Sequence, residues 1–550
     1  MNAALHILPS GLSLFSTLNS KTVMNGKLNF SARYVPGLVE RVGKVDQLTA
    51  SFWKPRICRI EVLIVTDTPS GSYGNGSFGL STFLKAFDEP LPFTSFQITK
   101  AHRTTDSSGL ADIENFRFNT HNLDQYDVIF LFGISRSGGQ ALSQSELRAV
   151  SEYMDNGGGM FATGDHEDLG VDMCGQIPRV RSMRRWYYPN PGPNGEPVAP
   201  AVSGSNHNTI VSTPGGGNQS DLVPQPIYPR YYYRFLPYFT PNPIYPIKFL
   251  TYPHPVLCSP DGVIKVLPDH MHEGLCEVPS DLTQTFNFDG YNVTEYPLVG
   301  ANRIKPEVIA NATNHQTNPD SSFGVIAALD GHKHADIGRV LVDATWHHFF
   351  NINISQFQTL KDQVDGGYIP DATEVAALQA YNHIQHYFRN IAYWLARRST
   401  QQCYRYRGWW WILNHVDVRM NYVIRKRSSF QELTYYHHLG TVARNALGDL
   451  ESDCQFTSFF PYLELQIREI QQIEFLEVIE DSLPFIHPDI ITNVTLGAAV
   501  SKLLPVFEEN RGDVGVGQIE EVIYSVMKDS IELLCENVTK SAKRLKTVLF

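Results

Sequence analysis

The chain has 550 residues, of which 42% are hydrophobic and 18% charged, and its 45 basic and 56 acidic side chains give a formal net charge of −11. This length predicts about three or four domain-sized units with ordinary cores, and the composition excludes a disordered protein. The acidic balance argues against a nucleic-acid partner, because phosphate binding depends on clustered Lys and Arg. No stretch approaches the roughly 18–20 apolar residues that cross a bilayer, so we expect no membrane partner.

Seven cysteines are scattered along the chain, and none belongs to a Cys-x-x-Cys pair. Their odd number and their spacing indicate neither a disulfide framework nor a thiolate zinc site. The N-terminus lacks a basic segment followed by an unbroken apolar one, since Pro9, Ser10, Asn19 and Ser20 interrupt it. We therefore expect no signal peptide and a cytoplasmic protein.

The first half of the chain alternates between strand and helix patterns. Residues 1–55 lack strong periodicity and are interpreted as an N-terminal extension. A β-branched run at Ile60–Val65 is followed by a glycine-rich loop at 70–76 and an apolar, periodic stretch, which is the pattern of strand, loop and helix. Further strands are predicted at Phe96–Thr99 and at Asp127–Phe132, whose continuous apolarity suits a parallel strand that is covered on both faces.

A capping box marks the next helix. The Ser143 hydroxyl can accept from the N–H of Glu146 while the Glu146 carboxylate reaches back, which predicts a helix that ends near Asn156 before three glycines. A short strand is predicted at Met160–Thr163. The repeated strand, helix and strand order predicts an α/β fold with a doubly wound, mostly parallel sheet.

A loop-rich segment at about 178–319 is interpreted as an insert in an α/β domain that spans residues 56–360. Such a long irregular stretch is usually an active-site elaboration or disordered, and its aromatic density favours an ordered one. Two further strands are predicted at Phe323–Leu329 and Arg339–Ala344. They are expected to form a hairpin that delivers two histidines at its end.

The periodicity becomes helical after residue 371, where Asp371 and Glu374 can cap the first helix, so residues 371–550 are predicted to be a helical C-terminal region. Charge is segregated within this region. Residues 389–427 hold nine bases and one acid, whereas residues 451–489 hold nine acids and one base. Two interpretations remain open, namely attraction between helices and a surface that binds a protein partner.

The turn after the fourth strand carries the strongest chemical signal. Loops at the carboxyl ends of strands line the ligand crevice of doubly wound sheets, and four consecutive ionisable residues stand there in the 163–168 turn. The alternative is that these acids cap the next helix or favour its dipole. Two histidines follow the last strand at the same edge. The predicted catalytic residues are therefore Asp165, His166, Glu167, His347 and His348.

Histidines and carboxylates also gather within the predicted insert. An extended chain would place His270 and His272 on one face. Imidazoles and carboxylates are ligands of Zn, Mn or Fe, and a catalytic site needs only three of them beside an open water position. Taken alone, any one of these histidines is more often a loop residue that forms ordinary hydrogen bonds than a metal ligand. The predicted metal ligands are His207, His270, His272 and Glu273, while His332 and His334 are expected to be solvated.

A basic stretch at 179–185 follows the acidic turn. Guanidinium groups bind carboxylate or phosphate with two parallel hydrogen bonds, so an anionic small-molecule substrate is predicted to bind Arg181, Arg184 and Arg185. The alternative is that these arginines neutralise the acids of the 163–168 turn. The glycine-rich loop at 71–76 lacks both the phosphate-loop and the dinucleotide signatures, and no nucleotide cofactor is expected.

The order of motifs resembles the class I glutamine amidotransferase-like superfamily, especially its ThuA-like (trehalose-utilisation-like) branch. The runs that carry the resemblance are DVIFLFG, LSQSELRAVSEYMDNGGGMFATGDH and GRVLVDATWHH. The resemblance covers roughly residues 57–170 and 323–350. It implies a flavodoxin-like sheet on which His166 faces His347 or His348 across the carboxyl edge.

The chain departs from the amidotransferase pattern at two places. Amidotransferases of this fold carry a nucleophilic cysteine two residues before a glycine, whereas Ala162 stands two residues before Gly164. A His-x-Glu pair normally completes their catalytic triad, whereas here His347 and His348 are followed by Phe349 and Phe350. Glutaminase chemistry that depends on a cysteine is therefore disfavoured. ThuA-like proteins also lack that cysteine, carry histidines there and are linked to carbohydrates only loosely.

The leading hypothesis is a hydrolase-like enzyme that acts on a small polar substrate. A metal or a histidine and carboxylate pair would activate water at the carboxyl edge of the sheet, and Glu167 or Glu273 would move the proton. The second hypothesis is a catalytically inactive ligand-binding or scaffold protein whose function lies in the helical region. A third is carbohydrate binding, which rests on the resemblance and on the aromatic residues around Tyr231–Tyr238.

Overall fold

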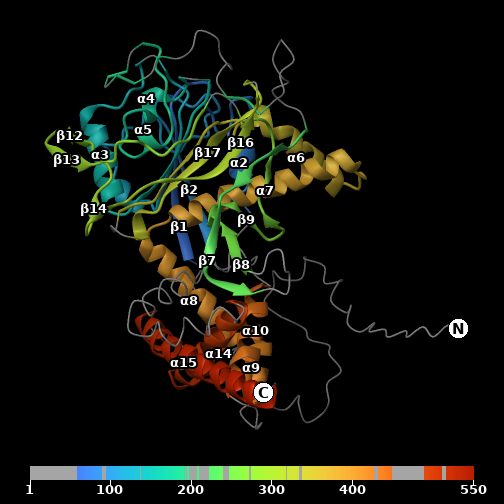
Figure 1. Cartoon of the computed structure of the whole chain (residues 1–550). Helices are drawn as coiled ribbons and strands as arrows, with labels where there is room; N and C mark the ends of the chain where they lie inside the picture. The colour runs from blue at the N-terminus through green and yellow to red at the C-terminus, as the bar shows by residue number, and fades with distance from the viewer. Residues whose placement is uncertain are drawn as a thin grey trace. The chain divides into compact units, whose positions relative to one another are not determined.

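An eight-stranded, mostly parallel sheet organises the α/β fold of the computed structural model (Figure 1). The structure describes residues 58–88, 94–136, 138–166, 168–190, 192–193, 195–196, 198, 207–209, 222–239, 247–271, 274–317, 319–333, 337–425, 432–448, 488–510, 514 and 516–549. In spatial order the strands are β2 (Thr94–His102), β1 (Cys58–Thr66), β3 (Val128–Phe132), β4 (Gly159–Thr163), β18 (Val340–Asp343), β17 (Ser321–Leu329), β16 (Glu307–Asn314) and β6 (Tyr228–Pro229).

The five strands from β2 to β18 are parallel to their neighbours, while β17, β16 and β6 pair antiparallel. The six strands and the hairpin expected from the sequence are confirmed, the hairpin being β17 and β18. Because parallel strands end at one edge, the residues that follow β1, β3, β4 and β18 come together there.

The helices complete the fold. Their bounds are α2 (Ser81–Lys85), α3 (Gln144–Asp155), α4 (Val171–Cys174), α5 (Val180–Met183), α6 (Asn351–Asp365), α7 (Ala372–Leu395), α8 (Arg398–Asn414), α9 (Val416–Arg425), α10 (Glu432–Gly448), α14 (Pro488–Glu509) and α15 (Val516–Leu549). Capping boxes begin α3 at Ser143 and α7 at Asp371, as the sequence predicts. Residues 451–487 of the acidic segment at 451–489 lie outside the described residues, so attraction between helices and a partner-binding surface both stay open.

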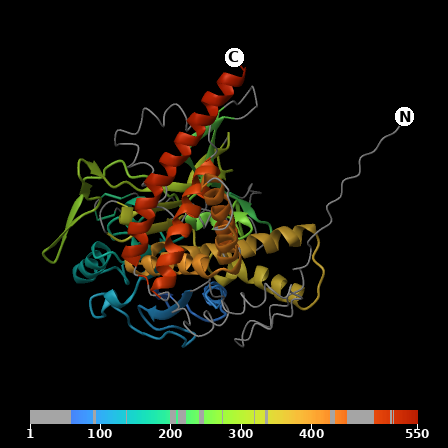
Figure 2. The same cartoon turned by 90° about the horizontal axis from the view of Figure 1, so that it is seen from below.

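The chain between α5 and β16 forms several short strands and one pair of longer strands, β7 and β8. They are β5 (Gln225–Pro226), β7 (Tyr231–Phe239), β8 (Ile247–Pro253), β9 (Cys258–Ser259), β10 (Gly262–Val263), β11 (Val266–Leu267), β12 (Thr285–Phe288), β13 (Tyr291–Thr294), β14 (Leu298–Val299) and β15 (Asn302–Arg303). The β12–β13 hairpin contacts α3 and projects outward in both views (Figures 1 and 2).

The core lies between the sheet and α7, which contacts β1, β4 and β18. Strands β3 and β4 are buried at every position. Phe83 of α2 packs edge-on against Phe132 of β3 and Phe388 of α7, with ring centroids 5.1 and 4.8 Å apart. Burial of each such side chain contributes about 1.5–3 kcal/mol, which explains why the apolar runs become central strands.

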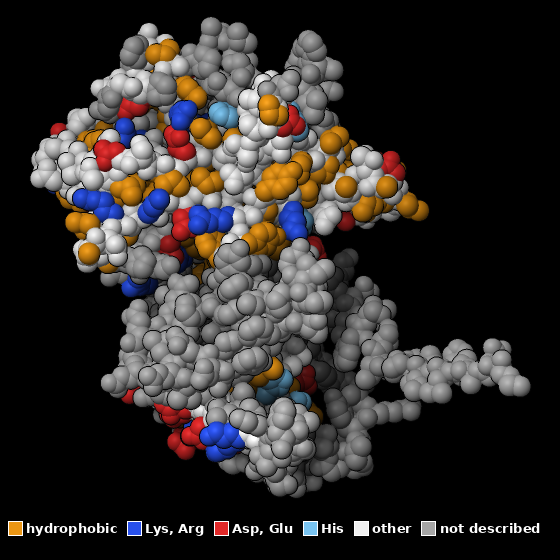
Figure 3. All heavy atoms as spheres, viewed as in Figure 1, with side chains coloured by type: hydrophobic (Ala, Val, Ile, Leu, Met, Phe, Trp, Pro, Cys, Tyr) orange, Lys and Arg blue, Asp and Glu red, His pale blue; other side chains and the backbone are white. Residues whose placement is uncertain are grey.

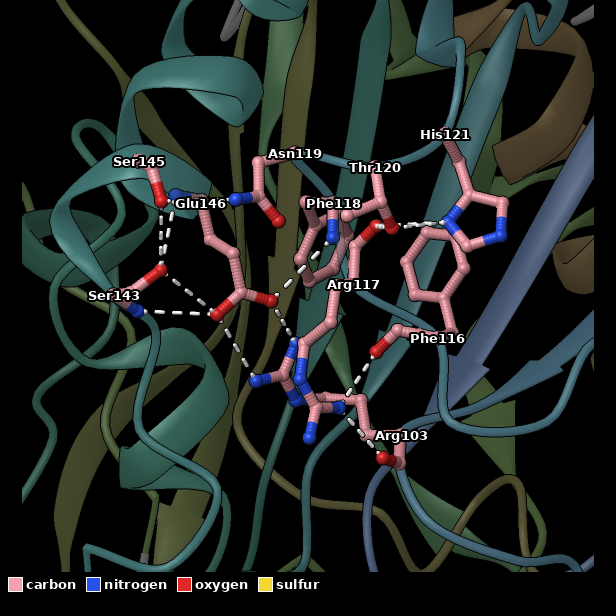
Figure 4. A network of polar contacts seen from close by, with 10 residues as sticks. All are labelled: Arg103, Phe116, Arg117, Phe118, Asn119, Thr120, His121, Ser143, Ser145 and Glu146. Carbon is pink, nitrogen blue, oxygen red and sulfur yellow. Dashed lines mark hydrogen bonds and ion pairs between the residues drawn. The ribbon is translucent and has the colours of Figure 1, made fainter.

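A buried ion pair joins the chain after β2 to the start of α3 (Figure 4). Arg103 Nη1 lies 2.6 Å from Glu146 Oε1, and the two side chains are 2% and 4% exposed. The Glu146 carboxylate also accepts the N–H of Ser143 and the N–H of Phe118. Burial opposes its ionisation, but the hydrogen bond and charge of Arg103 prevail and lower the pKa of Glu146.

On the described part of the face in Figure 3, basic and acidic side chains are interspersed among apolar ones. Within the ranges that the structure describes, no helix combines the length and the apolarity that crossing a bilayer requires.

Cys58 of β1 and Cys403 of α8 form a disulfide across 345 positions of the chain. The sequence analysis predicts no disulfide framework, and it could not reveal this single pair, because linear spacing says nothing about thiols that only the folded chain brings together. Cys174, Cys258 and Cys276 are buried thiols that form no disulfide. Disulfides persist mainly in oxidising compartments, and the cytoplasmic location stays a prediction.

Reduction of this disulfide is expected to lower the free energy of unfolding by about 2–4 kcal/mol, because the bond closes a very long loop in the unfolded chain. Urea unfolding with and without dithiothreitol measures the loss. A Cys58→Ser/Cys403→Ser variant should match the reduced protein and show no further response to the reductant. Equal stability of the oxidised and reduced forms would contradict the prediction.

Candidate active site

Two neighbouring strands deliver the candidate site at the carboxyl edge of the sheet. Strand β4 ends at Thr163, which is in register with Asp343 at the end of β18. The chain continues from these strands to Asp165 and to His347, so the parallel pairing brings the two side chains together. Asp165 and His347 are both almost completely buried.

One carboxylate oxygen gathers two imidazoles. Asp165 Oδ2 lies 3.0 Å from His347 Nε2 and 3.4 Å from His166 Nε2. The other oxygen, Oδ1, accepts a hydrogen bond of 3.2 Å from the Thr345 hydroxyl. Asp165, His166 and His347 therefore offer ligand atoms close enough together to hold one metal ion.

The opposite nitrogen of His347 faces a second group. Its Nδ1 lies 3.7 Å from Asp269 Oδ2 and 3.0 Å from the amide nitrogen of Asn353, which itself donates to Asp269. Asp269 Oδ1 lies 2.5 Å from His270 Nδ1. Asp269, His270 and His347 form a second set whose ligand atoms are close together, and all three side chains are buried.

A glycine allows this second segment to approach the sheet. A Cβ atom on Gly274 would lie 1.7 Å from the carbonyl oxygen of Ala344. Only a residue without a side chain fits such a close approach of two backbones. The segment that carries Asp269 and His270 can thus pack beside the chain that leads to His347.

The two carboxylates stabilise a positive charge at His347. Burial alone disfavours its imidazolium, but the nearby carboxylates of Asp165 and Asp269 outweigh burial and raise the pKa of His347 to about 10. Burial also opposes ionisation of Asp269, yet its hydrogen bond to His270 and the nearby imidazole of His347 lower its pKa well below the usual value. A metal ion on the same atoms would meet the same favourable potential.

His166 stands at the border between this buried cluster and solvent. Its side chain is 29% exposed, compared with 0% for Asp165 and 2% for His347. The backbone of His166 has φ +44°, a left-handed conformation that non-glycine residues rarely adopt and that concentrates at functional sites. His166 therefore lies on the solvent side of the group.

The structure brings together four of the predicted residues, Asp165, His166, His347 and His270. His348 points elsewhere, because its Nδ1 lies 3.7 Å from Asp343 Oδ2, which also accepts a 2.9 Å hydrogen bond from Tyr387 of α7. The ring of His207 lies against Phe323, tilted by 31° with centroids 5.1 Å apart, and His207 belongs to neither set.

Three predicted residues, Glu167, His272 and Glu273, lie outside the described residues. His334 does as well, whereas His332 is 6% exposed. Burial, with the charge of Arg339, lowers the pKa of His332 to about 3. The expectation that His332 is solvated is wrong, because its hairpin loop packs into the fold.

Two of the predicted substrate-binding arginines pair within the protein. Arg181 lies 3.1 Å from Glu196 and 3.4 Å from Glu295, while Arg185 lies 2.8 Å from Glu277. Their charges are thus paired within the protein, but with other acids than those of the 163–168 turn, which the alternative interpretation had named.

Arg184 is buried beneath the loop after β18. Its Nη2 donates to the carbonyl oxygen of Ala344 at 2.9 Å, and its guanidinium carbon lies 4.2 Å from the ring centroid of Trp186. This side chain supports the backbone between Asp343 and His347. Its contacts are those of a positioning residue, and its role as a substrate ligand stays a prediction.

Sequence reasoning missed three partners in the site. Asp269 directly precedes His270, and that adjacency was a signal that could have been used. Thr345 stands between the last strand and His347, which is a weaker signal. Asn353 lies inside α6, where a polar residue six positions after His347 carries no motif, so only the fold reveals its contact.

A further buried carboxyl stands at the end of β1. Asp67 accepts the N–H of Ile134 at 2.8 Å and the N–H of Ser135 at 3.2 Å, and thereby holds the loop after β3. Burial outweighs these hydrogen bonds and raises the pKa of Asp67 to about 6.

Asp67 is expected to make the folded state less stable as the pH rises towards neutrality. A raised pKa means that the stabilising protonated form is fully present below about pH 4 and is lost as the pH rises through 6. Asp67→Asn keeps an acceptor but does not titrate. The free energy of unfolding of the variant, measured relative to the wild type by urea unfolding, should be on the order of 1 kcal/mol higher at pH 7.5 than at pH 5. An identical difference at both pH values would refute this assignment.

No protein-family model and no curated protein matches the chain. The chemistry of the site therefore rests on the arrangement of Asp165, His166, His347, Asp269 and His270.

Proposed function

We propose that the chain is a hydrolase-like enzyme for a small polar substrate and that Asp165, His166 and His347 hold a divalent Zn, Mn or Fe ion. The observation that carries this proposal is the meeting of one carboxylate and two imidazoles from two separate loops at the carboxyl edge of the sheet. Two histidines and one carboxylate are a ligand set of catalytic zinc sites, which keep a fourth position for water.

Solvent exposure decides which of the two sets, the one with Asp165 and His166 or the one with Asp269 and His270, we propose as the metal site. Asp269 and His270 are only 1% and 3% exposed, so a metal bound beside them would have no open face to solvent. His166 provides that face in the first set. We therefore propose that Asp269 and Asn353 position His347 from the side of Nδ1, as carboxylates commonly do for histidine ligands.

A bound divalent cation would lower the pKa of its water so that attack on the substrate occurs near neutral pH. Asp165 supplies negative charge and is kept in place by the Thr345 hydroxyl. Asp269 holds Nδ1 of His270, so Nε2 of His270 is the proton acceptor that we propose among the described residues. Glu167 and Glu273 remain proposed proton carriers from the sequence.

The strand order supports the proposed kinship with the class I glutamine amidotransferase-like superfamily and its ThuA-like branch. The parallel part, β2-β1-β3-β4-β18, has the order 2-1-3-4-5 of flavodoxin-like sheets, whose ligands bind beyond the carboxyl ends of the strands. On this proposal the short strands before β16 belong to an insert, and α7 to α15 belong to a C-terminal helical region.

The thiols give no support to glutaminase chemistry. Ala162 occupies the position of the nucleophile and is buried in β4. Burial raises the pKa values of the Cys174 and Cys276 thiols well above the usual value, so neither offers a thiolate near neutral pH. The alternative proposal, an inactive ligand-binding or scaffold protein, draws on this missing nucleophile.

Metal content tests the proposed function. The protein is purified without a histidine tag, loaded with Zn, Mn or Fe(II) under anaerobic conditions, and analysed by inductively coupled plasma mass spectrometry. The expected result is about one equivalent of one metal, with chelation lowering the melting temperature. A metal content far below one equivalent after every loading, with unchanged stability after chelation, would refute the metal-assisted mechanism.

A further inference from the structure

A polar groove with a volume of about 290 Å³ opens among α2, α6 and α7. Three cationic side chains line it, one from each helix: Lys85, Lys361 and Arg389. Asp88 is the acid among its lining residues, and amide side chains complete the wall. The groove shares no lining residue with the Asp165, His166 and His347 set.

Arg389 is the fixed element of this groove. The residue is only 3% exposed, and its Nη1 donates to the carbonyl oxygen of Ala86, the C-cap of α2, at 2.9 Å. Its Nη2 lies 3.1 Å from His386 Nδ1. Burial and the nearby Arg389 charge lower the pKa of His386 to about 4, so His386 is a neutral acceptor at pH 7. A guanidinium held in this way loses little conformational entropy when a ligand binds.

The two lysines of the groove are more accessible to solvent than Arg389. Lys361 Nζ lies 2.7 Å from Asp365 Oδ2, but that pair is 35% and 62% exposed, and such surface pairs contribute little. Lys361 can therefore exchange this partner for a ligand at small cost. Lys85 is exposed on the last turn of α2.

This arrangement selects for a compact anion with several acceptor oxygens. Charge-assisted hydrogen bonds from ammonium and guanidinium groups to phosphate oxygens are about twice as strong as neutral ones. The amides of Gln358, Asn382 and Gln385 and the carboxylate of Asp88 can bond to hydroxyl groups. We propose that the groove binds a small, hydroxylated phosphate monoester.

The matched probes are glycerol 3-phosphate, inorganic phosphate and glycerol, and the method is isothermal titration calorimetry at low ionic strength. Glycerol 3-phosphate is expected to bind more tightly than phosphate, and glycerol is expected not to bind. Lys85→Gln and Lys361→Gln should each weaken binding about fivefold or more, since each removes one charged hydrogen bond. Lys305→Gln, at an exposed lysine outside the groove, should leave binding unchanged.

Melting temperatures of the variants verify that they fold, and both lysines are accessible enough for replacement. The proposal is overturned if glycerol 3-phosphate does not bind up to high millimolar concentration, or if Lys85→Gln/Lys361→Gln binds it like the wild type. Binding of a single-stranded oligonucleotide without binding of glycerol 3-phosphate would also overturn it, in favour of a polyanion. The metal content stays the separate test of the Asp165 site.

Discussion

Replacing His347 with glutamine is expected to abolish metal binding and any hydrolysis that depends on the metal. His347 belongs to both groups of potential metal ligands and lies beside both Asp165 and Asp269, so its loss removes a proposed ligand and the link between the two groups. Removing a residue that hydrogen-bonds to a metal ligand commonly lowers metal affinity 10–100-fold. Removing a direct ligand should therefore lower the affinity by more than about a hundredfold. Equilibrium dialysis against the metal that the wild type retains measures this loss.

His348→Gln is the matched control. His348 is adjacent in the sequence and equally buried, but its Nδ1 faces Asp343 on the side of α7. This variant should lose some stability and keep its metal. Near-ultraviolet circular dichroism shows whether each variant retains its fold. The proposed ligand set is wrong if His347→Gln binds metal like the wild type, or if both variants lose it equally while folded.

The contrast between these two histidines shows what the sequence can predict. Apolar runs and the pairing of parallel strands place His166 and the 347–348 pair at one edge of the sheet, and the structure confirms that placement for His166 and His347. Which of two adjacent histidines faces the crevice depends on the path of the loop after β18. Arg184 and Thr345 hold that path through contacts that appear only in the folded protein.

The contact of His270 with His347 was likewise beyond prediction from the sequence. His270 was found because imidazoles and carboxylates crowd together in the sequence, but its link to His347 spans 77 positions and depends on the approach of Gly274 to Ala344. Likewise, the acids that neutralise Arg181 and Arg185 lie in distant loops. Local patterns predicted elements and residue types, whereas tertiary packing selected the partners.

The buried ion pair between Arg103 and Glu146 carries the largest expected effect on stability. Arg103→Met should lower the free energy of unfolding by about 3–5 kcal/mol, because it leaves the Glu146 carboxylate buried without its cation. Urea unfolding at pH 7 measures the change. At that pH the pair contributes fully, because a carboxyl with a lowered pKa loses its contribution only as the pH falls through the folded-state value.

A double variant separates the unpaired charge from the lost contact. Arg103→Met/Glu146→Leu removes both charges, so it should be more stable than Arg103→Met and should cost about 1 kcal/mol, the contribution of the capping box that begins α3. The exposed Arg148–Glu152 pair on the same helix provides the control, and Arg148→Met should cost less than about 1 kcal/mol. If the double variant is as unstable as Arg103→Met, loss of packing rather than an uncompensated charge explains the effect, since only the charge is relieved by the second substitution.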